Sequence, residues 1–142
     1  MPDGKEKGKR RKAKVVQIRC FMDENELQKR LFKFAVDVLK LLRRLTGGID
    51  LKIISYQLGK AATSSGANYE EAQAAVSRAD FGFKVSIALK EMRESNYWLR
   101  ILHELYPEDE ETDCLVKESF ELKNILGSIN KKVSPRSQIK ID

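Results

Sequence analysis

The chain has 142 residues, of which 42% are hydrophobic and 34% are charged, and it contains only three prolines and eight glycines. This length fits one compact domain and excludes most two-domain enzymes, while so few prolines and glycines argue against a turn-rich β-sandwich. The formal net charge of +6 favours polyanionic partners such as nucleic acid.

The first 19 residues form a cationic arm. They contain eight basic and two acidic residues, whereas the rest of the chain has 19 of each and is neutral. The candidate nucleic-acid contacts of this arm are Lys5, Lys7, Lys9, Arg10, Arg11, Lys12, Lys14 and Arg19. The alternative interpretation is a solubilising tail, because charge runs are often simply solvated.

The same segment bears on localisation. Residues 1–14 are too polar to supply the apolar core of a secretion signal, and no apolar run in the chain reaches membrane-spanning length. Cys20 and Cys114 are far apart and have no metal-ligand spacing, which is typical of reduced thiols. We therefore expect a cytoplasmic protein without a membrane partner.

Residues 24–45 are the first predicted helix. Asp23 and Glu26 have the spacing of a capping box at its start. Apolar residues at three- and four-residue spacing share one face, namely Leu27, Leu31, Phe34, Val38, Leu41 and Leu45. A second apolar stripe comprises Phe32, Ala35, Leu39 and Leu42. Two stripes indicate burial by more than the helix's own bundle.

Basic residues also recur at helical spacing along this first helix. They are Lys29, Lys33, Lys40 and Arg44, and Asp37 interrupts them. If the arm binds nucleic acid, this face extends the cationic surface of the arm along the first helix. The alternative is an ordinary solvated face with paired charges.

The second predicted helix starts near Asp50, its expected N-cap, and its buried stripe consists of Ile54, Leu58, Ala61 and Ser65. The block 59–67 is rich in small residues, Gly-Lys-Ala-Ala-Thr-Ser-Ser-Gly-Ala. Small side chains allow a neighbouring helix to approach closely, but glycine weakens a helix by about 1 kcal/mol relative to alanine. The block therefore predicts close packing and a kink near residues 64–66.

The third predicted helix begins at Ser77, which has capping-box spacing to Asp80, and Pro107 ends it. Its buried stripe contains Phe81, Val85, Ala88, Met92, Leu99, Leu102 and Tyr106. A further apolar edge indicates subunit contact and consists of Ile87, Trp98, Ile101 and Leu105. We expect the subunit interface to use this edge together with Phe32 and Leu39, with Trp98 as its anchor.

The fourth predicted helix begins around Glu110 or Glu111, where acidic residues suit the positive end of the helix. Its buried face is Leu115, Leu122, Ile125, Leu126 and Ile129. We therefore predict an all-α fold, an antiparallel up-and-down four-helix bundle over residues 20–132, between the arm 1–19 and a short tail 133–142. An open helical array is the alternative.

Catalytic and metal-binding patterns are missing from the sequence. A di-metal bundle site needs Glu-x-x-His on two helices, but His103 is the one histidine and position 100 is Arg100. Gly59 and Lys60 do not form a phosphate-binding loop, because Ala61 follows them. We expect no enzyme activity, no metal and no cofactor. With no recognition-helix motif, zinc finger or aromatic–basic alternation, nucleic-acid binding is expected to be directed at the backbone.

Three stretches resemble a known family: Arg-Leu-Phe-Lys-Phe-Ala-Val at 30–36, Ser-Ser-Gly-Ala-Asn-Tyr-Glu-Glu-Ala at 64–72, and the segment 80–99. They are similar to the bacterial four-helix bundle proteins named for open reading frames in 23S ribosomal RNA intervening sequences, over about residues 24–130. The resemblance implies a homopentamer with a central channel and no established enzyme activity. Ser65, Asn68 and Glu71 match the family's signature positions, and we interpret them as structural.

Two hypotheses for function follow. The first is a non-enzymatic, homopentameric accessory protein that binds RNA or DNA through the arm and the basic helix face. The second rests on related proteins, which include the accessory variability determinant of diversity-generating retroelements, a basic pentamer that associates with a reverse transcriptase and its RNA template. In that hypothesis the chain is a protein-interaction scaffold whose main partner is a reverse transcriptase.

Overall fold

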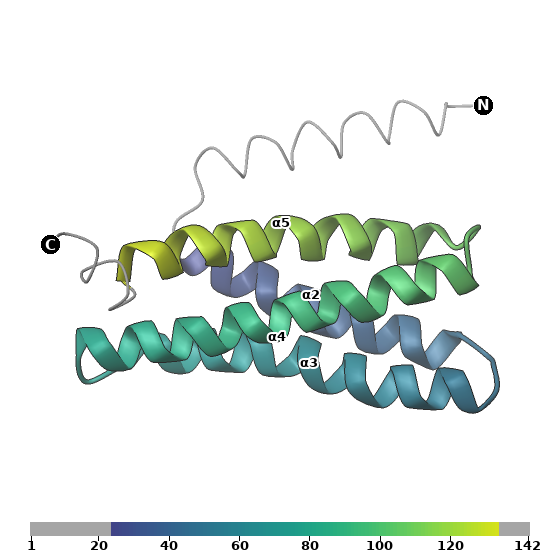
Figure 1. Ribbon diagram of the computed structural model, residues 1–142, viewed down its shortest axis with the longest axis horizontal. Coiled ribbons are helices and arrows are strands. Elements are labelled where there is room, and N and C mark those ends of the chain that lie inside the picture. The colour runs from purple at the N-terminus through teal and green to yellow at the C-terminus, as the bar shows by residue number, and fades with distance from the viewer. Residues whose placement is uncertain (1–23, 134–142) are drawn as a thin grey trace, which may run out of the picture.

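The computed structural model describes residues 24–133, and over this range the chain forms four α-helices and no strand. The helices are α2 (Glu24–Arg44), α3 (Ile49–Gln73), α4 (Arg78–Leu105) and α5 (Glu110–Val133). They lie alongside one another as a bundle, in which α4 neighbours both α3 and α5 (Figure 1). The arm 1–19, the predicted cap Asp23 and residues 134–142 lie outside the described residues.

The helix boundaries follow local capping chemistry. Ser77 is the N-cap of α4, and its hydroxyl accepts a hydrogen bond from the Asp80 backbone N–H at 3.0 Å, as predicted. The prediction of Asp50 as the N-cap of α3 is wrong, because Gly48 takes that position without a side-chain hydrogen bond. Asp50 lies in the first turn instead, where its charge still suits the positive helix end.

The core consists largely of the predicted stripes. Five of the six stripe residues of α2 are buried, and Val85, Ala88 and Met92 of α4 are fully buried. On α5, the buried face that packs into the core contains Leu115, Leu122 and Leu126. Tyr69 and Leu89 are also buried, although the sequence stripes did not include them. None of the described helices is both long enough and apolar enough to cross a bilayer.

The small-residue block of α3 brings its neighbours close. A β-carbon on Gly66 would lie 3.5 Å from the backbone of Leu31 in α2, which is ordinary contact distance. On the other side, the buried Ser65 hydroxyl donates to the Ala88 carbonyl of α4 at 2.8 Å. The block therefore packs closely, as predicted, and α3 continues through it as one uninterrupted helix to Gln73.

Ion pairs tie α5 to α2 at two levels. In the first, the Arg30 guanidinium bonds to Glu118 and lies 3.0 Å from the Glu121 carboxylate. Burial lowers the pKa of Arg30, but the hydrogen bonds and charges of these two carboxylates more than offset it, so that the pKa is raised. In the second, Arg44 pairs with Asp109, just before α5, and with Glu111 in the first turn of α5.

Candidate nucleic-acid interface

Among the arm residues, the candidates Lys5 to Arg19 lie outside the described part of the chain. The candidates on α2 are described, and Lys29, Lys33 and Lys40 are exposed there. Lys33 pairs with Asp37 at 2.5 Å, and Lys29 lies 3.8 Å from Glu26. Within residues 24–133, no carboxylate lies at ion-pair distance from Lys40. The α2 face is thus cationic but partly neutralised by its own helix.

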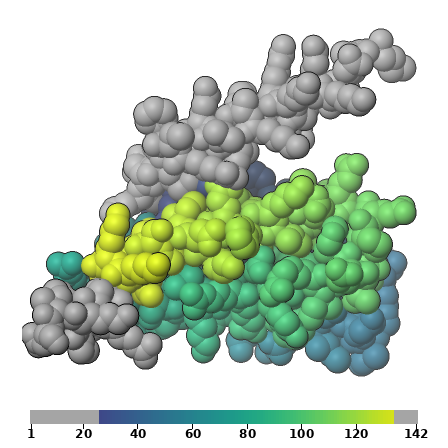
Figure 2. Space-filling model, turned by 45° about the horizontal axis from the view of Figure 1, so that its top comes forward, coloured from purple at the N-terminus to yellow at the C-terminus, as the bar shows by residue number. Residues whose placement is uncertain are grey.

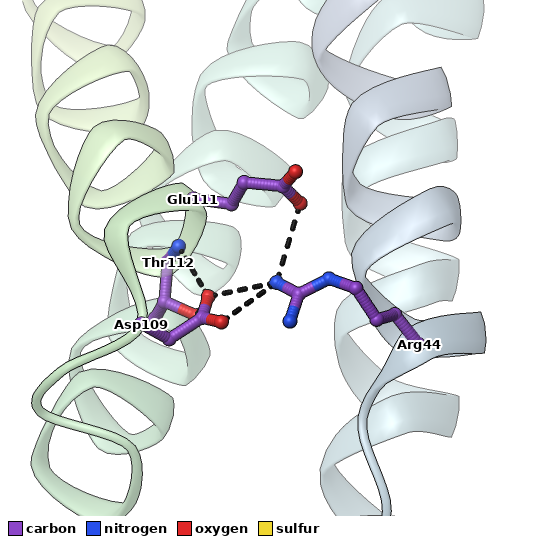
Figure 3. Close-up of polar contacts among 4 residues, drawn as sticks. All are labelled: Arg44, Asp109, Glu111 and Thr112. Atoms are coloured by element: carbon purple, nitrogen blue, oxygen red, sulfur yellow. Dashed lines mark hydrogen bonds and ion pairs between the residues drawn. The ribbon is translucent and has the colours of Figure 1, made fainter.

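Arg44, the fourth α2 candidate, contributes to the fold (Figure 3). Its Nη2 lies 2.7 Å from Asp109 Oδ1 and 3.3 Å from Glu111 Oε2. The hydrogen bond to Asp109 is the main cause that raises the pKa of Arg44. Asp109 also accepts hydrogen bonds from the backbone N–H and the hydroxyl of Thr112, at 2.9 and 2.7 Å. Arg44 is therefore less available to a phosphate than the three lysines.

The signature residues make contacts within the bundle. Ser65 bonds to the Ala88 carbonyl as described above, and the Asn68 amide donates to the Ser64 carbonyl at 2.8 Å, one turn back along α3. Glu71 lies 3.6 Å from the Lys84 ammonium of α4. The contacts of Ser65 and Glu71 join α3 to α4, whereas that of Asn68 lies within α3, and the structural role of the three residues stays a prediction.

The single histidine lies near the end of α4 and is half-buried. Its Nδ1 atom is buried and has no hydrogen-bond partner in the described range. No group of three or more histidine, cysteine or acidic side chains gathers in residues 24–133 at metal-binding distance. Cys114 is a free, exposed thiol on α5.

A groove that the sequence did not predict lies between α4 and α5. It is on the face that Figure 2 shows in green and yellow-green. It is open, has a volume of about 700 Å³, and is lined by Asn96, Arg100, Val116, Lys117, Phe120, Glu121, Lys123 and Asn124. The Lys123 ammonium lies 4.5 Å from the centroid of the Phe120 ring. The Arg100 guanidinium lies 5.8 Å from the Tyr97 ring centroid. Each helix thus pairs an aromatic residue with a cation three positions later, a spacing that a search for strict alternation overlooks.

The predicted interface residues divide into two groups. Phe32 is 65% exposed on α2, and Leu39 and Leu105 are also exposed. Ile87, Trp98 and Ile101 are half-buried, and both Trp98 and Ile101 pack against the chain's own core. The α3 helix adds three exposed apolar residues that the sequence analysis did not select, Ile49, Ile53 and Tyr56.

Comparison with known proteins identifies relatives that cover most of the bundle. The family model of the 23S rRNA-intervening sequence protein matches residues 23–128. A crystal structure of a protein of unknown function from the S23 ribosomal protein family of Bacteroides thetaiotaomicron VPI-5482 is 34% identical, with a TM-score of 0.65. The match covers 74% of this chain and 98% of that one. A search of curated proteins finds no significant match.

Proposed function

The chain belongs to the 23S rRNA-intervening sequence protein family, and from this premise we propose that it is a non-enzymatic accessory protein that binds RNA or DNA. The observation that carries the proposal is the segregation of charge, because the entire net charge of +6 resides in the first 19 residues. A concentrated cationic segment binds phosphates by releasing their counterions, without reading base sequence.

The exposed lysines of α2 extend this binding surface. Lys33 and Lys29 pair with carboxylates three or four residues away on the same helix, and their side chains are about three-quarters exposed. Such exposed pairs contribute only about 0.3–0.5 kcal/mol. Both lysines therefore exchange a carboxylate for a phosphate at small cost, and Lys40 contributes a cation that no described carboxylate neutralises.

The proposal includes a homopentamer of antiparallel bundles. Its support is the exposed apolar surface of α2 and α3, where Phe32, Leu39, Ile53 and Tyr56 all face solvent in the single chain. Burying such surface stabilises an assembly by roughly 25 cal/mol for each Å² removed from water. Five arms in one particle then raise avidity for a long polyanion without any new contact.

The binding test compares the full chain with a variant in which the seven cations of residues 5–14 are replaced by glutamine. Fluorescence anisotropy with labelled RNA and DNA, measured over a series of salt concentrations, should show a steep salt dependence for the full chain. The variant should bind much more weakly and with a shallower slope, while its circular dichroism and sedimentation stay unchanged. Equal affinity of the two proteins would contradict the role of the arm.

The assembly test uses sedimentation velocity at micromolar concentration. The full chain should sediment with a mass about five times the 16.3 kDa of one chain. Phe32→Glu should weaken the assembly and leave the helical signal intact, because this side chain is 65% exposed and contributes little to the core of its own bundle. Trp98 is a poorer probe, since it packs against that core. A wild-type monomer would overturn the pentamer.

A further inference from the structure

The α4–α5 groove combines cations with one exposed aromatic ring, Phe120, and a second exposed ring, Tyr97, lies next to the groove residue Arg100. Tyr97 and Phe120 are each about half exposed, at 50% and 54%. Arg100 lies 5.8 Å from the centroid of the first ring, and the Lys123 ammonium lies 4.5 Å from the centroid of the second. Exposed aromatic rings beside cations are the usual parts of a surface on which unpaired bases stack while phosphates are neutralised.

A buried amide at the base of the groove joins α4 to α5 and positions Arg100. Asn96 is 5% exposed, and its Nδ2 donates to the Ser119 hydroxyl of α5 at 3.0 Å. Its Oδ1 accepts a hydrogen bond from Arg100 Nε, also at 3.0 Å. The guanidinium of Arg100 is therefore held at the groove by a neutral partner, which leaves its charge uncompensated for an incoming anion.

The acidic residues near the groove are already engaged. Glu121 lies 3.0 Å from Arg30 of α2, and Asp113 pairs with Lys117 at 2.9 Å. Among the described residues, no carboxylate lies at ion-pair distance from Arg100 or Lys123. The local charge of the groove is therefore positive, although the bundle as a whole is neutral.

The helical register continues the cationic strip beyond the groove. Arg93 precedes Arg100 by seven residues, which places both on the same side of α4. Lys131 follows Asn124 by seven residues and lies on the same side of α5. Both flanking cations are exposed. Seven helical residues rise about 10 Å, so each flanking cation extends the cationic surface along its helix by about that distance.

We propose that the α4–α5 groove binds an unpaired nucleic-acid segment, with one base stacked on Phe120, a second on the neighbouring Tyr97 beside Arg100, and phosphates bound by Arg100 and Lys123. This inference rests on the proposed nucleic-acid-binding function and adds a second site, distinct from the arm, with a preference for single strands. A duplex keeps its bases stacked on one another, so that a duplex offers these rings no base face. As a phosphate draws Lys123 away from the Phe120 ring, that ring face becomes free for a base.

The test measures binding of full-length chains to two probes, a single-stranded oligouridylate and an RNA duplex of the same length. Phe120→Leu keeps the apolar bulk but removes the ring, and should weaken single-strand binding by at least about fivefold while leaving duplex binding unchanged. Arg100→Gln should also weaken single-strand binding and lower its salt slope. The matched control is Phe83→Leu, because Phe83 is an exposed ring of α4 that does not line the groove. That control should change neither affinity.

The possible results distinguish a failure of the proposed nucleic-acid-binding function from a failure of the groove inference. If the wild-type chain binds neither probe, both the proposed function and the groove fail. If it binds both probes and Phe120→Leu preserves the ratio of single-strand to duplex affinity, the groove inference alone is overturned. A change in sedimented mass for Phe120→Leu would assign the groove to subunit contact and would likewise overturn the inference.

Discussion

Removing the Arg30 guanidinium should destabilise the bundle more than any other single change of a surface charge on α2. Its side chain is only 13% exposed, and it hydrogen-bonds to Glu118 and forms an ion pair with Glu121, both of α5. Arg30→Met retains an apolar stem of similar length but deletes the cation between two carboxylates. The variant then has two neighbouring negative charges in a partly buried seam, where each carboxylate is costly to desolvate.

The magnitude follows from the burial of the three side chains. Breaking a fully buried ion pair by removing one partner costs about 3–5 kcal/mol. Glu118 remains 30% exposed, however, and solvent screens part of the penalty. We therefore expect a loss of about 2–3 kcal/mol, a large fraction of the roughly 5–15 kcal/mol that stabilises a typical domain.

The assay is urea unfolding followed by far-ultraviolet circular dichroism, at one fixed protein concentration because the proposed assembly would make apparent stability depend on concentration. Lys33→Met is the matched control, since Lys33 pairs with Asp37 on the surface with a side chain that is 74% exposed. The control should lose no more than about 0.5 kcal/mol. Adding Glu118→Gln and Glu121→Gln to Arg30→Met should restore most of the stability. Equal losses for Arg30→Met and Lys33→Met would refute the argument.

Three further predictions concern two glycine substitutions and the acid sensitivity of Asp109. Gly127→Ala should raise the unfolding free energy by about 0.5–1 kcal/mol, because alanine favours the helix and its β-carbon meets no atom within 4 Å. Gly82→Ala should lower the unfolding free energy in the same urea assay, since its β-carbon would lie 2.9 Å from a backbone carbonyl at the end of α5. Burial raises the pKa of Asp109, but hydrogen bonds from Thr112 and Arg44 lower it overall, below the ordinary value of 3.8. Its stabilising effect should therefore be present above pH 3.8 and disappear as the pH falls through the lower folded value, so that wild type and Asp109→Asn converge in acid.

Local patterns were sufficient to predict the four helices and most of the core. Apolar residues at helical spacing identified the buried faces, and Ser77 identified the start of α4. The burial of Tyr69, which is 1% exposed, was not predicted, because this residue lies in a polar stretch of α3 that interrupts the apolar stripe. The N-cap of α3 was predicted wrongly because Gly48 takes this position through its backbone conformation, with no side-chain hydrogen bond that a sequence pattern could indicate.

The candidate site was less accessible to sequence reasoning, because its properties depend on contacts between distant segments. Arg44 has the same helical spacing as Lys40, but its partners Asp109 and Glu111 lie more than sixty residues away and engage its charge. The sequence does contain the two aromatic–basic pairs of α4 and α5. However, the rotation of each helix about its axis decides whether these two pairs lie on the same side of the bundle. That rotation depends on the packing of the whole core.

The proposed assembly surface and the proposed groove use different helices, apart from the interface candidates on α4, of which Leu105 is exposed. The exposed apolar residues Phe32 and Leu39 lie on α2, and Tyr56 lies on α3, whereas residues of α4 and α5 line the groove. Loss of assembly removes avidity, and this weakens binding of single strands and duplexes alike. Loss of the Phe120 ring removes stacking, which unpaired bases alone can use. The ratio of the two affinities would therefore test the proposed groove, and a common change in both would test the proposed pentamer and its arms.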